Sequence, residues 1–168
     1  MGRPAFVNGI RPKGVVPTRL VVVGTRTFNQ PARMWEILDR FVFWWDDVFL
    51  ITGANYSDWN GEHFQRSWVH GQGSQYTGAD YHAWKWAEHN WYETQTVCAE
   101  WKRYGKSAGP RRNREMLKVA GPNCFLVAFW DGRSPGTADC LRAFDSVLDS
   151  NRIRVVRYDK WRKKKSGS

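Results

Sequence analysis

Long apolar runs and paired cysteines are both missing from this sequence. No stretch of about 18 apolar residues occurs, and the opening MGRPAFVNGIRPKG lacks the apolar centre of a secretory signal. We therefore expect no membrane span and a cytoplasmic protein. The three cysteines, Cys98, Cys124 and Cys140, are odd in number and lack the short paired spacings of a zinc site or a disulfide framework. We expect buried free thiols.

Acidic residues are scarce at the two ends of the chain. The net charge is +10, of which residues 1–19 contribute +4 with no acid and residues 159–168 another +4 with a single aspartate. The intervening residues 20–158 therefore carry nearly equal numbers of basic and acidic side chains. Basic tails attract polyanions without sequence preference, which allows a non-specific contact of both tails with nucleic acid. A solubilising charge run is an equally good interpretation of the ending KKKSGS.

The body of the chain alternates between short apolar runs and helical stretches. Its periodicity predicts strands at 20–23, 48–52, 94–99, 124–130 and 153–158, and helices at 31–45, 78–91, 109–120 and 136–150. Such alternation indicates βαβ units with right-handed crossovers. We expect the α/β class, with a single Rossmann-like domain over residues 20–158 and a mostly parallel sheet of about five strands with helices on both faces.

Residues 54–77 form a polar, aromatic insertion that is too long for an ordinary connection. Stacking of a base on Trp59, Phe64, Trp68 or Tyr76 is one use of these aromatic rings. Packing as an extra layer or as a contact between subunits of a homo-oligomer is an equal or better interpretation.

The histidines do not suggest a metal site. His63 and His70 lie in the insertion without a recognised ligand spacing. In the predicted helix at 78–91, His82 and His89 share a face with Lys85, which predicts solvated histidines on a polar face. We expect no metal and no resident cofactor.

Glycine-rich turns follow several of the predicted strands. In a parallel sheet such turns meet at one edge, near the switch in strand order, where ligands bind. Backbone N–H groups approach phosphate closely at glycine, and helix N-termini favour negative charge. Several such turns at one edge therefore indicate an anion site. They are Gly24-Thr25-Arg26, Gly53, Gly78-Ala79-Asp80 and Gly132-Arg133-Ser134-Pro135-Gly136-Thr137.

Three arginines crowd the predicted start of a helix in GPRRNREM, residues 109–116. The helix dipole disfavours a cation there by about 0.3–1 kcal/mol. An anion, phosphate in our interpretation, would complete a site built around Arg112, because a guanidinium grips phosphate oxygens with two parallel hydrogen bonds. We expect Arg111 and Arg114 to face solvent or to pair with a nearby glutamate.

Four motifs occur in a fixed order along the chain, and together they resemble a known family. They are G-T-R at 24–26, G-A-D at 78–80, A-G-P-R-R-N at 108–113 with Met116, and G-R-S-P-G-T-A-D at 132–139. This set resembles the SLOG superfamily of Rossmann-like nucleotide-binding domains, and within it the YspA, or cpYpsA-related, branch. The resemblance covers residues 20–158. It implies that Arg112 and Asn113 hold the arginine and asparagine positions, and Gly136 and Thr137 the phosphate-binding positions.

The resemblance implies a pocket for a nucleotide or a nucleotide-derived molecule, such as a nucleoside monophosphate or an ADP-ribose-like signal of bacterial conflict systems. We expect a sensor or sequestering protein rather than an enzyme. Asp80 has two interpretations of equal weight, a helix cap and an acceptor for ribose hydroxyls. The expected donors to phosphate are Gly24, Thr25, Gly53, Gly78, Gly132, Ser134, Gly136 and Thr137, the expected cations are Arg26 and Arg112, and the orienting groups are Asn113 and Asp80.

Two alternative functions follow from relatives of this family. Phosphoribohydrolases of the LOG type resemble the chain at a G-G-x-G-T-x-x-E motif, but the position of their glutamate falls on Cys140 here. Asp139, one residue before Cys140, points about 100° away from that position around the helix. A nucleotide N-glycosidase would therefore need Asp80 or an acid in the insertion. The second alternative is DprA-like binding of single-stranded DNA.

Overall fold

The computed structural model describes residues 14–54 and 78–158. The extension before residue 14, most of the predicted insertion and the basic tail lie outside these residues, and with them the predictions for Trp59, Phe64, Trp68, Tyr76, His63 and His70. The elements are β1 (Thr18–Gly24), α1 (Pro31–Phe41), β2 (Val48–Ala54), α3 (Ala79–His89), β3 (Glu93–Cys98), α4 (Trp101–Tyr104), the 3-10 turn η1 (Gly105–Ser107), α5 (Ala108–Ala120), β4 (Phe125–Trp130), α6 (Pro135–Asp145), the 3-10 turn η2 (Ser150–Arg152) and β5 (Ile153–Arg157).

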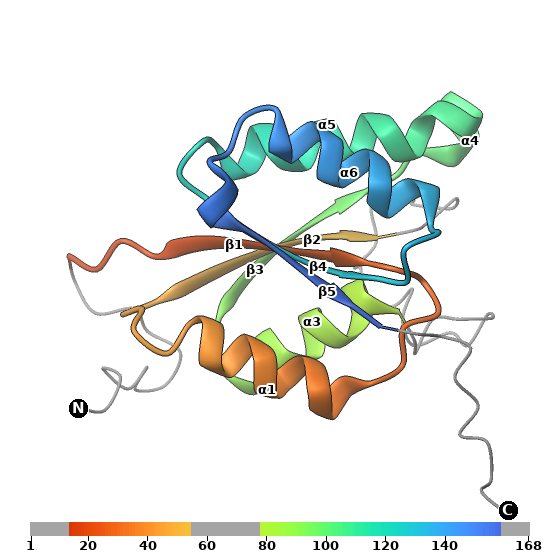
Figure 1. Ribbon diagram of the computed structural model, residues 1–168. Coiled ribbons are helices and arrows are strands. Elements are labelled where there is room, and N and C mark those ends of the chain that lie inside the picture. Colours follow the sequence, from red (N-terminus) through yellow and green to blue (C-terminus); the bar gives the residue numbers. More distant parts are fainter. Residues whose placement is uncertain (1–13, 55–77, 159–168) are drawn as a thin grey trace, which may run out of the picture.

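The five strands form one sheet in the order β3-β2-β1-β4-β5, and every neighbouring pair is parallel. Figure 1 shows α1 and α3 on one face of this sheet and α5 and α6 on the other. The predicted α/β fold with a single Rossmann-like domain is confirmed. Among the described residues, no helix combines the length and the apolar character that crossing a bilayer requires.

The alternation of side chains along β1 divides the core into two layers. Leu20 and Val22 are fully buried on the side of α1 and α3, whereas Val21 and Val23 are buried against α5 and α6. A strand covered on both faces in this way is apolar at every position, which explains the continuous run in its sequence.

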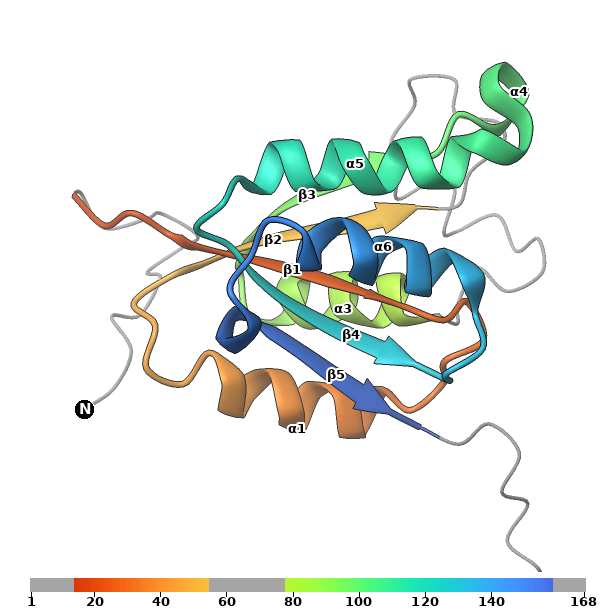
Figure 2. The ribbon, with the colours of Figure 1, turned by 45° about the horizontal axis from the view of Figure 1, so that its top comes forward.

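The order of the strands places a switch point beside β1. From β1 the chain moves outward through β2 to β3, and then crosses the other face through α5 to form β4 on the opposite side of β1. Figure 2 shows the carboxyl ends of β1 and β4 side by side, and Gly24 pairs with Phe129 there. The fold therefore opens a crevice at the carboxyl ends of these two strands.

Two predicted helices are too long. Helix α1 ends at Phe41 rather than at residue 45, yet the ring of Trp45 still packs against Phe41 and Phe125 at centroid distances of 5.4 and 4.9 Å. The apolar stripe thus continues in a turn after the helix. In the same way α6 ends at Asp145 while Leu148 remains buried. The spacing of apolar residues predicted which side chains are buried, but it did not predict where each helix ends.

Helix α5 begins at Ala108, one residue earlier than predicted and directly after η1. Pro110 is consequently the third helical residue, a position whose missing N–H still belongs to the unbonded first turn. Arg112 lies in the second turn. The repulsion by the helix dipole that we expected at this residue is therefore weaker, because the dipole acts mainly within the first turn.

The prediction of solvated histidines was wrong for His82. This side chain is buried on the core face of α3, with its Nε2 atom 3.2 Å from Asn29 Oδ1 and its ring edge-on to Phe28. Burial lowers the pKa of His82, which favours the neutral imidazole. His89 is exposed, as predicted. The core face of α3 carries Trp86 and three alanines, whereas Tyr81 and Trp84 are only half-buried, so the aromatic residues alone did not mark the buried side.

Candidate functional site

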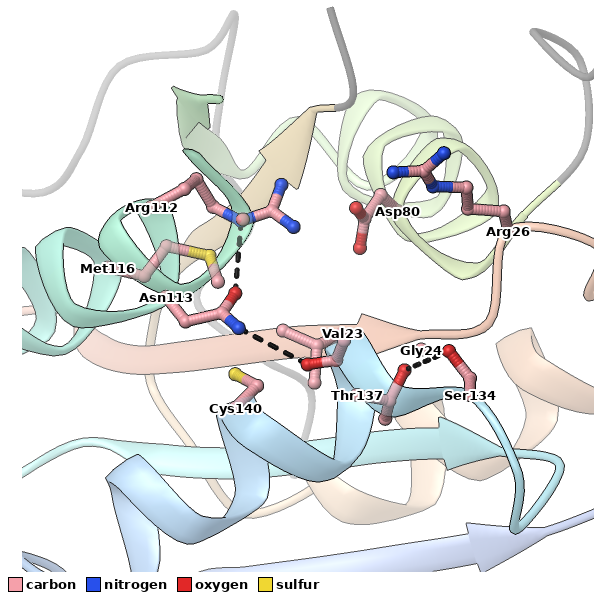
Figure 3. Close-up of a pocket in the computed structure, with 12 residues that line it drawn as sticks. Val23, Gly24, Arg26, Asp80, Arg112, Asn113, Met116, Ser134, Thr137 and Cys140 are labelled. Carbon is pink, nitrogen blue, oxygen red and sulfur yellow. Dashed lines mark hydrogen bonds between the residues drawn. The ribbon is translucent and has the colours of Figure 1, made fainter. Parts of the chain in front are cut away.

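A small pocket of about 70 Å³ opens at the carboxyl edge of the sheet, above β1 and between α5 and α6 (Figure 3). We call it the phosphate pocket, after the anion that the sequence motifs led us to expect there. One strand, β1, and three helices, α3, α5 and α6, contribute residues to it. This position beside the switch in strand order is where ligands bind in open α/β sheets. Its lining residues are Val23, Gly24, Arg26, Asp80, Gly109, Arg112, Asn113, Met116, Ser134, Gly136, Thr137 and Cys140.

The guanidinium of Arg112 enters this pocket from the second turn of α5. Its Nε donates to Oδ1 of Asn113 at 3.0 Å, and its far end lies against the backbone of Gly53. A Cβ atom at Gly53 would stand 2.8 Å from Arg112 Cζ and overlap Nη1. Gly53, a predicted donor to phosphate, does not line the pocket, and its lack of a side chain leaves space for Arg112.

Asn113 joins the two helices that flank the pocket. Its Nδ2 atom donates to the carbonyl of Gly136 at 3.2 Å and to Asp139 Oδ2 at 3.0 Å, while Oδ1 accepts from Arg112. The buried amide therefore fixes Arg112 relative to the first turn of α6. We predicted that Asn113 would orient a ligand, and in this structure its contacts orient the protein groups that line the pocket.

Asp80 is the second residue of α3, and Figure 3 shows its carboxylate between the guanidinium groups of Arg26 and Arg112. Its Oδ1 lies 3.3 Å from the hydroxyl of Thr52 on β2. Burial raises the pKa of Asp80 from 3.8 to about 6, although Arg112, Thr52 and Arg26 all favour the charged form. The carboxyl group therefore changes its charge close to neutral pH.

Arg26 completes the charged cluster from the turn after β1. Burial lowers the pKa of Arg26, and the charge of Arg112 acts in the same direction, whereas Asp80 opposes the shift. An arginine remains protonated throughout the physiological range even so. The cluster carries a charge of +1 when Asp80 is ionised and +2 when it is neutral, so an anion entering the pocket would offset an excess of positive charge.

The first turn of α6 supplies the other wall of the pocket. Ser134 is the N-cap residue, Pro135 follows it, and the hydroxyl of Thr137 donates to Ser134 Oγ at 3.4 Å. Asp131 braces this turn, because its Oδ1 accepts the backbone N–H groups of Arg133 at 2.9 Å and Ser134 at 2.8 Å. The N–H groups of a first helical turn have no partner within the helix and point outward along its axis, which makes them donors to an anion.

Three other predicted donors lie outside the pocket lining. The buried Thr25 accepts the N–H of Asp131 at 3.3 Å through Oγ1, so it fastens the β1 turn to the β4 turn. Gly78, with φ of 97°, lies against the backbone of Arg26. Gly132, with φ of 80°, lies under the guanidinium of Arg157. These residues shape the turns that support the pocket. Their position after a strand in the sequence could not show whether they contact a ligand or only support a turn.

Four lining residues were absent from the predicted site. Gly109 and Met116 share a helical face with Arg112 and Asn113, so helical spacing could have identified them. Val23 is the penultimate residue of β1. Cys140 lies one turn after Gly136, and burial raises its pKa to about 12, which keeps the thiol neutral.

Neither residue near the expected glutamate position supplies a carboxylate to the pocket. Cys140 lines it as a thiol, and Asp139 does not line it. Asp139 instead accepts from Asn113 and lies 3.9 Å from Arg114 and 3.8 Å from Arg142. Among the described residues that line the pocket, Asp80 is therefore the only acid.

The two other arginines of the GPRRNREM stretch are exposed, as predicted. Arg111 Nε donates to Ser107 Oγ at 3.2 Å, and Arg114 Nη1 donates to the carbonyl of Pro110 at 2.9 Å. Within residues 14–54 and 78–158, no three histidine, cysteine or acidic side chains are grouped as metal ligands would be. Searches against protein-family models, curated proteins and solved structures give no match for this chain.

Proposed function

We propose that the protein binds the phosphate group of a nucleotide or nucleotide-derived molecule in the phosphate pocket, and that it acts as a sensor or sequestering protein. The observation that carries this proposal is the convergence of Arg26 and Arg112 on the first turn of α6, around a pocket with one acid. A resemblance to the SLOG superfamily in its sequence motifs supports the same proposal.

In the proposed complex, phosphate oxygens accept from the N–H groups of Gly136 and Thr137 and from the hydroxyl of Ser134. Arg26 and Arg112 neutralise the charge. Charge-assisted hydrogen bonds of this kind contribute about 1.5–3 kcal/mol each. Asp80 is placed to accept from a sugar hydroxyl beside the phosphate, since a carboxylate would repel a second phosphate in the same position.

The size of the pocket limits the part of the ligand that it holds. Sites for whole small-molecule ligands are usually about 300–1,000 Å³. The phosphate pocket, with its 70 Å³, fits a phosphate and part of a sugar. The remainder of the ligand would extend beyond the pocket.

Binding can be tested by calorimetric titration of the full chain with ADP-ribose and with nucleoside monophosphates. Arg112→Ala should weaken binding at least about tenfold, because it removes one of two charges that face the phosphate. Arg142→Ala on the exposed side of α6 is the matched control and should change the affinity less than about twofold. Equal affinities of the wild type and Arg112→Ala, or no binding of any phosphate compound, would contradict the proposal. Mass spectrometry of small molecules released by heating the purified protein would identify a ligand that copurifies.

A nucleotide N-glycosidase is a second candidate, and the environment of Asp80 favours it. A carboxyl group whose pKa is about 6 can donate a proton near neutral pH, as a departing base requires. Incubation with nucleoside monophosphates should then release free base, and Asp80→Asn should abolish the release. Bound but uncleaved nucleotide would favour the sensor.

A further inference from the structure

A second, larger cavity lies on the other side of α5. Its volume is about 530 Å³, and we call it the outer cavity. Figure 2 shows the end of β3, helix α4 and the start of α5 together at this corner of the molecule. The lining residues are Val97, Cys98, Glu100, Tyr104, Ala108, Arg111, Arg112, Arg114, Glu115 and Lys118.

Within the part of the chain that the structure describes, Arg112 is the only residue that lines both cavities. The two cavities are otherwise lined by different faces of α5, one including Gly109, Asn113 and Met116, the other including Ala108 and residues 111, 115 and 118. Ala108 and Gly109, which lie where the faces meet at the start of the helix, have the two smallest side chains. A ligand passing Arg112 from one cavity to the other would therefore meet little steric obstruction from them.

The outer cavity has a planar, positively charged wall. The guanidinium carbon of Arg111 lies 4.3 Å from the centroid of the Tyr104 ring, and Nε of the same arginine donates to Ser107 at 3.2 Å. These two contacts hold the guanidinium plane in place before any ligand arrives. Guanidinium planes and aromatic rings both stack on nucleobases.

The rest of the lining suits a nucleoside better than a second phosphate. Val97, Cys98 and Ala108 offer an apolar surface, and Glu100 and Glu115 supply acceptors for hydroxyl and amino groups. Arg114 and Lys118 add positive charge, which attracts a ligand that carries a diphosphate. A volume of about 530 Å³ lies within the usual range of about 300–1,000 Å³ for small-molecule sites. A nucleoside also presents the base that a stacking wall accommodates.

We propose that the outer cavity holds the nucleoside part of the ligand, and that the ligand is a nucleoside diphosphate sugar whose diphosphate passes Arg112. This inference rests on the proposed function. One phosphate lies at the first turn of α6 in the phosphate pocket, the other faces Arg112, and the base stacks beside Arg111 and Tyr104. The two cavities thus form one elongated site.

Two probes of different length separate the two cavities. Ribose 5-phosphate can occupy only the phosphate pocket, whereas ADP-ribose can occupy both. Arg111→Ala and Lys118→Glu should each weaken ADP-ribose binding about fivefold or more and leave ribose 5-phosphate within about twofold of the wild type. Arg112→Ala should weaken both probes. Arg154→Glu, an equal charge reversal at an exposed position on β5, is the control for long-range electrostatics and should leave both affinities nearly unchanged.

The outcomes distinguish this inference from the proposed function. If Arg111→Ala and Lys118→Glu leave ADP-ribose binding unchanged while Arg112→Ala weakens it, the outer cavity is not used and the phosphate pocket stands. If the variants weaken both probes equally, the outer cavity does not hold a separate part of the ligand. If neither probe binds the wild type, this inference is overturned, and the proposed function is overturned with it only if nucleoside monophosphates do not bind either.

Discussion

The carboxyl oxygen Oδ1 of Asp80 lies 3.3 Å from Thr52 Oγ1, and the same hydroxyl oxygen lies 2.9 Å from the carbonyl of Val22. A threonine hydroxyl has one proton, so it can donate to only one of these acceptors at a time. When Thr52 donates to Val22, a neutral Asp80 can donate its own proton to Thr52, whereas an ionised Asp80 cannot. Because Val22 competes for the proton of Thr52, the support that Thr52 gives to a charged Asp80 is weak, and burial raises the pKa of Asp80 to about 6.

The first prediction concerns the pH dependence of anion binding. Because the pKa of Asp80 is about 6, this residue is mostly charged at about pH 7.5 and mostly neutral at about pH 5. A charged Asp80 opposes an incoming anion, so the affinity for ADP-ribose should rise about tenfold as the pH falls over this range. Arg26 and Arg112 keep their charge and Cys140 stays neutral throughout. The diphosphate of ADP-ribose does not titrate in this range, which makes it a suitable probe for calorimetry.

Asp80→Asn is the control for this dependence. The amide is neutral at every pH, so the variant should bind ADP-ribose with an affinity that barely changes from about pH 7.5 to 5. If the affinity of the variant varies with pH as strongly as that of the wild type, another group is responsible.

The second prediction concerns stability. The folded pKa of Asp80 is raised above 3.8, so its contribution to stability is fully present below about pH 3.8 and is lost as the pH rises through about 6. Asp80→Asn should therefore raise the free energy of unfolding by about 1–3 kcal/mol at pH 7.5, and by little near pH 4. Urea unfolding at both pH values measures the difference. The control is Asp145→Asn at an exposed position, whose effect on stability should not depend on pH in this way. If Asp80→Asn instead destabilises the protein at pH 7.5, the buried charge of Asp80 is not what lowers the stability of the wild type.

The architecture was predictable from sequence because it depends on patterns within single elements. The run Leu20 to Val23 is apolar at every position since β1 is covered on both faces. Parallel strands then bring the glycine turns to one edge, and Arg112 follows from the arginines at the start of α5. These features need no knowledge of contacts between distant segments.

The internal contacts of the site were not predictable because they join segments far apart in sequence. Thr52 and Asp80 meet only when β2 packs beside α3, and Thr25 meets Asp131 only when β1 pairs with β4. The role of Gly53 depends on the conformation of an arginine many residues later. Glycine and threonine after a strand look the same in sequence whether they touch a ligand or a neighbouring loop.

The third prediction tests the role of Gly53. A methyl group in Gly53→Ala would crowd the guanidinium of Arg112, whose Cζ lies 2.8 Å from the position of the new Cβ. Because this guanidinium is the end of a flexible side chain, it can move aside, and the free energy of unfolding should change by less than about 1 kcal/mol. The affinity for ADP-ribose should fall about tenfold. In an Arg112→Ala background the added Gly53→Ala should cause no further loss, and additive losses would assign Gly53 a separate effect.

The fourth prediction concerns the three cysteines, which are all free in the described structure. Burial raises the pKa of Cys98 to about 11 and that of Cys140 to about 12, and it also raises the pKa of Cys124. Alkylation by iodoacetamide requires the thiolate, so at about pH 8 Cys98 and Cys140 should each react at least about a hundredfold more slowly than glutathione, and Cys124 should also react more slowly. Mass spectrometry after timed labelling measures this. Labelling in denaturant should modify all three, and rapid labelling of Cys140 in the folded protein would show that its thiol is exposed or activated.

The last prediction concerns the link that Asn113 makes between α5 and α6. Asn113→Asp replaces the donor Nδ2 with an oxygen that faces Gly136 O at 3.2 Å and Asp139 Oδ2 at 3.0 Å. Acceptors that face each other without a proton between them should cost about 2–4 kcal/mol of unfolding free energy. The other carboxylate oxygen can still accept from Arg112, and the new negative charge beside Arg112 should lower its affinity for phosphate. Adding Asp139→Asn restores a donor opposite the new carboxylate and should recover much of the stability in urea unfolding. If the double variant is no more stable than Asn113→Asp alone, the contact between these two side chains does not hold the helices together.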